Sequence, residues 1–436
     1  MTSLDVSIDL PTNNVVVPPG VPGRLVATPM RYVVYFVSIV TVSTNDIAVV
    51  GAGPVGALTA LGLAQRGHRV VLLESEQELA TSPRAIVYYW HVLHGLDALG
   101  VLDDIDAEGI RNTAFCTRVL ASGDEAVVSL APLASITSRP WNIHLGQHEV
   151  VRIVLDHLSR HPNAELRLGA AVTSVRQDSD GVVLDVTGAD AGEVRASWVV
   201  AADGARSAVR SSLGISFEGT TWDDRFVATD LSYPFDRAGL GNANMILDAE
   251  NGCVIARIDD TTWRWTWGES AELPADTVLD RLPGRLAALG FPDVPYDIVS
   301  ATPYRMHQRS ADRMREGRVL LVGDAAHATN PTGGLGLTSG MYDLFALLDP
   351  LDEAVRGGDE SLLDVWAAER LRIFDEYASP MATASKHRVY DETDSASLTR
   401  FVRGAAAAVD EDEAIRRLSA MTRLRSGFPR HHASFV

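Results

Sequence analysis

The segment from Asn45 to Glu76, NDIAVVGAGPVGALTALGLAQRGHRVVLLESE, restricts the fold more than any other part of the sequence. Its pattern predicts an apolar strand over Ile47 to Val50, a helix over about Val55 to Arg66 and a second strand over Arg69 to Leu73. A strand, a glycine-rich turn, a helix and a strand in this order form a βαβ unit. The sequence therefore predicts an α/β fold that begins with a Rossmann-like unit.

The turn of this unit has the GxGxxG spacing of a dinucleotide site. Gly51 allows a tight turn, Gly53 lets the backbone approach a pyrophosphate, and Gly56 lets the helix pack closely on the strand. Glu74 follows the second strand, where a carboxylate accepts hydrogen bonds from the hydroxyls of an adenosine ribose. We predict that NAD or FAD contacts Gly51, Gly53, Pro54, Val55, Gly56, Glu74 and Ser75.

Two later segments favour FAD. WVVAADGARSAVRSSLG predicts a strand that ends at Asp203-Gly204, followed by a short helix. GRVLLVGDAAHATNPTGGLG predicts a strand that ends at Gly323-Asp324, then a loop and a helix from about Leu335. A carboxylate at the strand end can accept hydrogen bonds from a ribityl chain, and the proline and glycines let a flat ring approach the backbone. The start of the following helix would stabilise negative charge on that ring.

The motifs GAGPVG, ADGARSAVR and GDAAHATNPTGGLG resemble, in order and spacing, the class A FAD-dependent aromatic monooxygenases typified by para-hydroxybenzoate hydroxylase. The resemblance extends over residues 46–377 and includes Pro83-Arg84 and the segment GQHEVVRIVL. Thr338 stands where family members often have Asn, and Asn330 stands where they often have Pro. These two differences affect the detailed contacts to the flavin ring and not FAD binding itself. The resemblance implies that FAD is also held by Arg84, Gln147, Asp203, Gly323, Asp324, Pro331, Gly334, Gly336 and Leu337, with Asp203 contacting either the flavin or NAD(P)H.

The same resemblance implies an activity. It is that of an NAD(P)H-dependent, single-component FAD monooxygenase, which uses O₂ and a flavin C4a-hydroperoxide to hydroxylate a phenolic or polycyclic aromatic small molecule. Pro331, Gly333 and Gly334 would border the reactive edge of the flavin. NADH or NADPH would dock transiently, since no second GxGxxG is present. The alternative is another flavin enzyme on this fold: a halogenase, an epoxidase or a prenyl reductase.

Other side chains carry less specific signals. Tyr89, Tyr304 and His307 are candidates for the base that takes a phenolic proton, with ordinary core or surface roles as the alternative. We expect His327 to support its loop by hydrogen bonding. Trp263, Trp265 and Trp267 alternate and so share one strand face, which is either the core of a sheet or an aromatic wall over the substrate.

We expect a discontinuous FAD-binding domain over 45–215 and 304–360. An inserted mixed β-sheet domain for the substrate would cover 216–303, with part of 80–145, and a C-terminal helical region 361–436. Residues 1–44 are interpreted as a disordered or artefactual leader, with translation starting near Val42.

Composition excludes several classes of function. A formal charge of -19 argues against electrostatic binding to nucleic acid or to an anionic membrane. The only cysteines, Cys116 and Cys253, cannot form a disulfide framework and are expected to be buried. We predict no metal site, because the pairs His91/His94 and His144/His148 lack a third ligand. A cytoplasmic monomer or homodimer without stable membrane association is expected.

Overall fold

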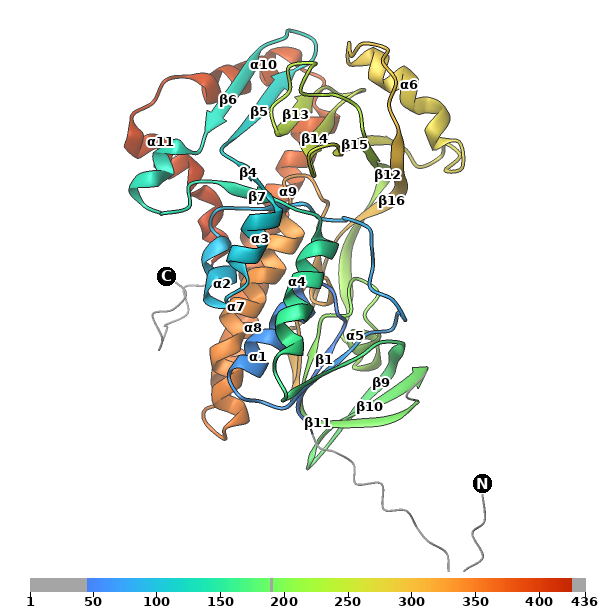
Figure 1. Ribbon diagram of the computed structural model, residues 1–436, viewed down its shortest axis with the longest axis vertical. Coiled ribbons are helices and arrows are strands. Elements are labelled where there is room, and N and C mark those ends of the chain that lie inside the picture. The colour runs from blue at the N-terminus through green and yellow to red at the C-terminus, as the bar shows by residue number, and fades with distance from the viewer. Residues whose placement is uncertain (1–44, 189–190, 426–436) are drawn as a thin grey trace, which may run out of the picture. The chain divides into compact units, whose positions relative to one another are not determined.

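The computed structural model describes residues 45–188 and 191–425 (Figure 1). The expected leader and the start near Val42 lie outside the described residues, as does the chain after residue 425. The described residues belong to one compact unit. The domain boundaries at 216 and 303 therefore remain predictions.

The βαβ unit forms the centre of an eight-stranded sheet, in the order β17-β18-β11-β1-β2-β8, with β10 and β9 added beyond β11. Strands β18, β11, β1, β2 and β8 are parallel to one another, so their carboxyl ends lie at one edge, whereas β17 and β10 pair antiparallel with β18 and β11. The bounds are β1 Asn45–Val50, β2 Val70–Leu73, β8 Ala164–Arg167, β9 Ala170–Asp178, β10 Gly181–Gly188, β11 Gly192–Ala201, β17 Arg315–Glu316 and β18 Val319–Leu321.

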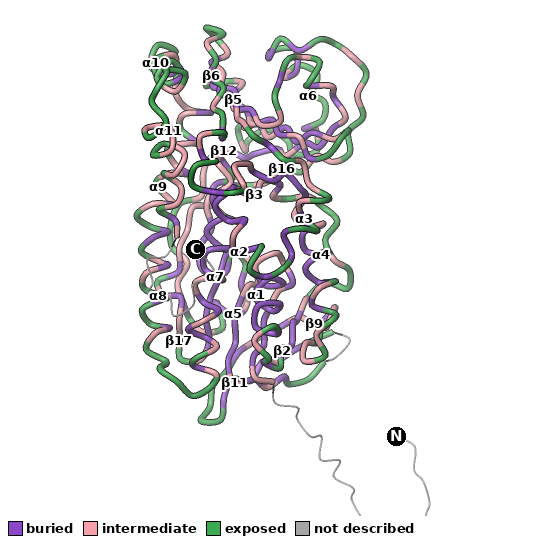
Figure 2. The backbone as a smooth tube through the Cα atoms, turned by 60° about the vertical axis from the view of Figure 1, so that its left-hand side comes forward, coloured by how far each residue is buried: buried purple, intermediate pink, exposed green. Residues whose placement is uncertain are grey.

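Helices α1 (Pro54–Gln65), α4 (Gln147–Ser159), α7 (Leu335–Val355) and α8 (Ser361–Ile373) pack beside this sheet. Helix α1 starts with a proline, which suits the first helical position, and is almost wholly buried (Figure 2). A Cβ atom on Gly62 would lie only 2.7 Å from the Leu348 side chain, so this glycine allows α1 to approach α7 closely. The predicted first helix and the helix from Leu335 are confirmed.

A second eight-stranded sheet has the order β19-β16-β12-β15-β14-β13-β5-β6. Its pairs are antiparallel except for β13 with β5, so the mixed sheet that the sequence predicts is confirmed. The long strands β12 and β16 have an irregular register between Thr221 and Arg225. The bounds are β5 Ala114–Val119, β6 Glu125–Ser129, β12 Phe217–Leu231, β13 Ala243–Leu247, β14 Cys253–Arg257, β15 Trp263–Ser270, β16 Ile298–Ala311 and β19 His327–Ala328.

The remaining elements are short, and those after residue 361 are helical, as expected, up to the last described residue. The third sheet pairs β3 (Val87–Tyr88), β7 (Asn142–His144) and β4 (Ile110–Asn112). The helices are α2 Leu93–Ala98, α3 Leu102–Glu108, η1 Ala131–Ser135, α5 Ala208–Ser212, α6 Val278–Ala288, η2 Gly323–Ala325, η3 Phe374–Ala378, α9 Ser379–Lys386, η4 His387–Asp391, α10 Ser395–Ala406, α11 Glu411–Leu418 and η5 Ala420–Leu424, with η3 and η4 in π geometry. Within residues 45–188 and 191–425, no helix combines the length and apolar character needed to cross a membrane.

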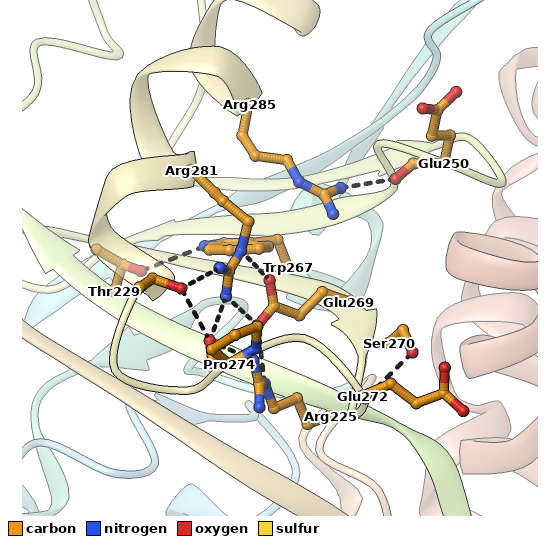
Figure 3. A network of polar contacts seen from close by, with 11 residues as sticks. Arg225, Thr229, Glu250, Trp267, Glu269, Ser270, Glu272, Pro274, Arg281 and Arg285 are labelled. Atoms are coloured by element: carbon orange, nitrogen blue, oxygen red, sulfur yellow. Dashed lines mark hydrogen bonds and ion pairs between the residues drawn. The ribbon is translucent and has the colours of Figure 1, made fainter.

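The three alternating tryptophans of β15 are buried in one hydrophobic cluster with α6. Beside them the Glu269 carboxylate accepts hydrogen bonds from Arg225 and Arg281, 2.8 Å and 2.7 Å long, which hold α6 against the sheet (Figure 3). Hydrogen bonds from Arg281 and Arg225 outweigh the opposing effect of burial and lower the pKa of Glu269. The interpretation of Trp263, Trp265 and Trp267 as the core face of a sheet is confirmed.

Candidate active site

The predicted cofactor residues meet at one edge of the first sheet. Gly51 follows β1, Glu74 follows β2, and Gly323 with Asp324 follows β18. Asp203 lies two residues after β11, which is the strand between β1 and β18. The residues that follow these four strands are far apart in the sequence but are neighbours in the fold. They lie at the edge where open α/β sheets bind ligands.

The glycines of the first turn have different structural roles. Gly51 has a φ of +97°, and a Cβ there would lie 2.5 Å from the Ala202 carbonyl oxygen. A Cβ on Gly56 would lie 1.9 Å from the Gly51 oxygen. A Cβ on Gly53 would meet no protein atom within 4 Å. Gly51 and Gly56 are therefore needed by the fold itself, whereas Gly53 faces open space at the start of α1.

Glu74 closes the turn from the second strand. Its Oε2 accepts a hydrogen bond of 2.7 Å from the Ala52 amide, and Ser75 donates to its Oε1. Pro54 and Val55 are the first residues of α1. The acidic side chain is thus next to the glycine turn, as the motif predicts.

Gln147 and Arg84 come from two segments that are joined by hydrogen bonds. Gln147 is the first residue of α4; its amide donates to the Ala85 carbonyl at 2.8 Å, and its Oε1 accepts from the Ala85 amide at 3.2 Å. Arg84 is exposed and close enough to Asp324 to lower the pKa of that carboxyl, against a larger effect of burial. The two residues therefore lie on one side of the sheet edge.

Two carboxylates at this edge are incompletely satisfied by the protein. Asp324 is surrounded by protein atoms, and the resulting desolvation raises its pKa. The residue is nevertheless exposed, so a ligand can reach its carboxylate from the solvent. Burial also raises the pKa of Asp203, whose Oδ1 is buried without a hydrogen-bond partner. These acceptors fit a ligand that brings hydroxyl donors, as FAD does.

The loop after β18 is shaped by glycine. Gly333 and Gly334 have φ values of +91° and +64°, and the Tyr89 hydroxyl donates to the Gly333 carbonyl at 2.6 Å. Pro331 is exposed, Leu337 is half-buried, and a Cβ on Gly336 would lie 4.0 Å from Asp324 Oδ1. The loop therefore presents backbone, with little side chain, next to the carboxylate.

His327 supports this loop, as predicted. Its Nε2 is 2.7 Å from Asp343 Oδ2, and its ring stacks on Phe374 at 4.3 Å. Asp343 also accepts from the Gly323 amide at 3.0 Å and from Arg370 Nε at 2.8 Å. One fully buried carboxylate on α7 thus fixes the turn that carries Asp324.

The three candidate bases lie in different environments. Burial raises the pKa of Tyr89 to about 12 and raises that of Tyr304 further. His307 Nδ1 is 2.9 Å from the Thr221 hydroxyl, and desolvation, with nearby arginines, lowers the pKa of His307. Of the three, only Tyr89 contacts the glycine loop.

The two histidine pairs do not share helix faces. His91 precedes α2 while His94 lies within it, and His144 belongs to β7 while His148 belongs to α4. Across the described ranges, with 189–190 and both ends of the chain left out, no group of three or more His, Cys, Asp or Glu side chains could hold a metal ion. Cys116 and Cys253 are both buried.

Sequence reasoning missed a cationic cluster beside Asp203. Arg206, Arg305 and Arg309 all lie close enough to His307 to lower its pKa. Arg309 donates to the Thr221 hydroxyl at 2.9 Å, and within 45–188 and 191–425 none of these arginines forms an ion pair with a carboxylate. The signal was present in β16 as the alternation Arg305, His307, Arg309, which places the three side chains on one face.

A half-open row of the second sheet was also missed. Five directly paired residues cross the middle strands on the face opposite the tryptophans, and each is half-buried or exposed. The Tyr390 hydroxyl donates to the carbonyl of Thr266 within this row, Met245 of the row packs against the same hydrophobic cluster as Tyr390, and Ile86 packs against Ala256 beside the row. We call this row the sheet window; it consists of Thr302, Ala228, Thr266, Val254 and Met245.

A family model described as FAD binding domain matches residues 44–379. The chain belongs to this FAD-binding family. It is 43% identical over 350 residues to 6-hydroxy-3-succinoylpyridine 3-monooxygenase of Pseudomonas putida, covering 79% of this chain and 89% of that protein. It is 39% identical over 348 residues to para-nitrophenol 4-monooxygenase of a Pseudomonas species, covering 78% and 86%. The crystal structure of p-nitrophenol 4-monooxygenase from Pseudomonas putida matches with a TM-score of 0.84 and 37% identity, covering 88% of this chain and 99% of that one.

Within the FAD-binding family the chain is a class A aromatic monooxygenase, which confirms the resemblance seen in its three motifs. Its cofactor is FAD, and its co-substrates are O₂ and NADH or NADPH. The relatives are monooxygenases, and this favours oxygenation over the halogenase, epoxidase and reductase alternatives.

Proposed function

We propose that the enzyme holds FAD along the carboxyl edge of the first sheet and hydroxylates a para-substituted phenol or hydroxypyridine. The supporting observation is the alignment of Gly51, Glu74, Asp203 and Asp324 at the ends of four neighbouring parallel strands. Gly53 leaves open space for a pyrophosphate at the start of α1, and the two carboxylates supply acceptors for sugar hydroxyls. Bound there, FAD supplies the two-electron reduction of O₂ and the transfer of one oxygen atom to the ring.

The remaining cofactor residues have assigned roles in this proposal. Ser75 and Glu74 contact the adenosine ribose, and Arg84 and Gln147 lie along the pyrophosphate and ribityl chain. Pro54, Val55 and Gly56 place the amides of α1 towards the phosphates. The ring rests on the loop after β18, and its reactive edge is bordered by Pro331, Gly333 and Gly334, with Gly323, Gly336 and Leu337 around it.

The substrate class is taken from the names of two relatives. One is a para-nitrophenol 4-monooxygenase and the other a 6-hydroxy-3-succinoylpyridine 3-monooxygenase. In each name the oxygenated carbon is the one that carries the nitro or succinoyl group, and it lies para to the hydroxyl-bearing carbon. We therefore propose attack at the substituted carbon para to a ring hydroxyl, with the ring between the glycine loop and the sheet window.

The cationic cluster is proposed to receive the nicotinamide cofactor. The pyrophosphate of NADH or NADPH needs positive charge, and this chain has a net charge of -19. Arg206, Arg305 and Arg309 provide local charge that no carboxylate in the described part of the chain neutralises. A transient site on this surface agrees with the single GxGxxG motif of the sequence.

We expect the purified protein to be yellow with bound flavin and to consume O₂ and NAD(P)H faster when 4-nitrophenol is added. NAD(P)H supplies two electrons, one oxygen atom enters the ring and the other leaves as water. Oxygen added at the carbon that carries the nitro group displaces this group as nitrite and leaves 1,4-benzoquinone, so nitrite and the quinone should both be detected; reduction of the quinone to hydroquinone would consume a second NAD(P)H. A product that keeps its nitro group and gains oxygen at a neighbouring carbon would contradict the proposed position, and a protein that binds no flavin would contradict the activity.

A further inference from the structure

The peptide that joins Gly333 to Gly334 has few steric restraints. Both residues have positive φ values, +91° and +64°, and neither has a side chain that resists a rotation of the peptide between them. The loop before them is held by a side chain, because Asn330 Oδ1 accepts from the Thr332 amide at 3.1 Å. The loop after them is held by α7, which begins at Leu335. This peptide can therefore rotate without moving the rest of the loop.

Two hydrogen bonds restrain the orientation of this peptide. Its N–H, on Gly334, donates to the Pro331 carbonyl at 2.9 Å. Its carbonyl, on Gly333, accepts from the Tyr89 hydroxyl at 2.6 Å. The first bond is made within the loop itself, whereas the second comes from a residue 244 positions away in the chain. Tyr89 thus supplies one of the two restraints, and it does so from another segment.

The ring of Tyr89 is itself held by two other rings. It stacks on His91, with ring centroids 5.6 Å apart and an interplanar angle of 12°. His91 stacks in turn on Tyr342 of α7, at 5.8 Å and 10°, and His91 Nδ1 is 2.7 Å from the Tyr342 hydroxyl. Because the Tyr89 ring is already ordered by this packing, its hydroxyl loses little conformational entropy when it bonds to the loop.

The chain before Tyr89 is anchored to the second sheet. Arg264 of β15 donates from Nη1 to the carbonyls of Pro83 and Arg84. Two further hydrogen bonds of 2.8 Å pair the Arg264 guanidinium with the Asp230 carboxylate of β12. Both charged side chains are buried. The segment that carries Tyr89 is therefore fixed as well as the ring.

The end of α9 bounds the two glycines on another side. A Cβ on Gly333 would lie 3.6 Å from the Ser385 hydroxyl oxygen. The next residue, Lys386, is buried, and its Nζ is 2.7 Å from Asp391 and 3.3 Å from Asp224. The surroundings of the loop are thus held in place by hydrogen bonds and ion pairs. The orientation of the peptide between the glycines is the variable that the Tyr89 hydroxyl controls.

We infer that Tyr89 is a positioning residue, whose hydroxyl holds the Gly333 carbonyl and so keeps the backbone of the glycine loop in the orientation that receives the flavin ring. This inference rests on the proposed function, since it takes the loop to border the reactive edge of the ring. Without the hydroxyl the loop adopts more orientations, and FAD binding has to select one of them, which costs affinity. Burial raises the pKa of Tyr89 to about 12, so the hydroxyl keeps the proton that it donates. In this role Tyr89 is a donor to the loop and not the base for a phenolic proton.

The test removes this hydroxyl by Tyr89→Phe, which leaves the ring in its stack. We expect FAD to bind roughly threefold to tenfold more weakly, as the loss of one hydrogen bond implies. Fluorescence titration of the apoprotein with FAD measures the dissociation constant. In the holoenzyme a larger share of the O₂ consumed with 4-nitrophenol should leave as hydrogen peroxide, formed from O₂ with the two electrons of NAD(P)H.

Tyr88→Phe is the matched control. Tyr88 is the neighbouring residue, its ring is buried, and its hydroxyl has no hydrogen-bond partner among residues 45–188 and 191–425. This variant loses the same atom without losing a bond to the loop. It should therefore bind FAD as the wild type does and release the same share of hydrogen peroxide.

The outcomes separate the inference from the proposed function. Unchanged FAD affinity and peroxide release in Tyr89→Phe, or equal losses in Tyr88→Phe, overturn the inference and leave the proposed monooxygenase activity in place. The pH at which bound 4-nitrophenol ionises, followed by its absorption, is a further readout. An upward shift of that pH in Tyr89→Phe, with FAD affinity unchanged, would show that Tyr89 acts on the substrate, which also overturns the inference. A wild-type protein that binds no FAD overturns both.

Discussion

A substitution at Gly53 should affect FAD binding without affecting folding. Its φ of -65° is accessible to any residue, and a Cβ there meets no protein atom within 4 Å. We expect Gly53→Val to fold normally and to weaken FAD binding at least about tenfold, because the added methyl groups occupy the space proposed for the pyrophosphate. Fluorescence titration of the apoprotein with FAD measures the dissociation constant.

Two further glycines serve as controls for this variant. A Cβ added at Gly241 would have no protein atom within 4 Å, and this glycine lies outside the motif, so Gly241→Val should leave FAD affinity unchanged. Gly56→Val would force a clash with the Gly51 oxygen at 1.9 Å and should fail to accumulate as folded protein. Full FAD affinity in Gly53→Val would contradict the placement of the pyrophosphate.

At the scale of single elements, the sequence predicted what depends on near neighbours. The alternation in β15 predicts a strand whose three tryptophans share a face, and that is confirmed. Which face is open depends on α6 and on Ile86, and the latter lies more than 170 residues away in the chain. The role of Arg264 was equally hidden, because its partners Asp230 and Arg84 come from distant segments.

The glycine motifs allowed more to be predicted, because their residues act through the backbone. Glycine turns, strand ends and helix starts are specified within a few residues, so the positions of Gly51, Asp203 and Asp324 at one sheet edge followed from local patterns and the rules of parallel sheets. The arginine cluster did not follow, because Arg206 joins β16 only in the folded chain.

Lys386 joins the C-terminal helices to the second sheet. It is the only lysine of the chain and is buried at the end of α9, with Nζ 4.5 Å from the centre of the Trp222 ring. Asp391, its partner in η4, also contacts His387 at 2.5 Å, and Asp224 lies in the irregular part of β12. The ammonium therefore holds the turn that places Tyr390 beside the sheet window.

We expect Lys386→Met to lower the free energy of unfolding by about 1–3 kcal/mol, because two carboxylates then face each other without a cation. The expected loss stays below that for a fully buried pair, since both carboxylates are partly exposed. Urea unfolding measures the change. Lys386→Arg should not restore stability fully, because a guanidinium is larger and planar. Arg400→Met, at an exposed pair with Asp394, is the control and should change stability by less than about 0.5 kcal/mol.

At the scale of the whole molecule, two buried histidines couple folding to pH. Burial, with a smaller effect of Arg425, lowers the pKa of His91 to about 3. Burial also lowers the pKa of His144 to about 4, although its Nδ1 contacts the Arg257 carbonyl at 2.9 Å. In the unfolded chain both titrate near a pKa of about 6.5. Between these values the unfolded state binds protons that the folded state does not.

The two histidines therefore do not reduce the free energy of unfolding above about pH 6.5. As the pH falls from there towards about 4, each histidine lowers the free energy of unfolding by up to about 1.4 kcal/mol per pH unit. Asp203 and Asp324 act in the opposite direction, because their raised pKa values let the folded state take up protons first. The change in the free energy of unfolding with pH, measured on the wild type alone, is thus a sum of opposing contributions. A variant is needed to isolate the contribution of one histidine.

We expect His144→Gln to lose less stability than the wild type between pH 7 and pH 5, since glutamine keeps a donor for the Arg257 carbonyl and does not titrate. Urea unfolding of both proteins at the two pH values, with FAD at the same saturating concentration, gives the difference in slope. The carboxylates contribute equally to both proteins, so that difference belongs to His144. Parallel losses of stability in the two proteins would show that the His144 imidazole is not held neutral by the fold.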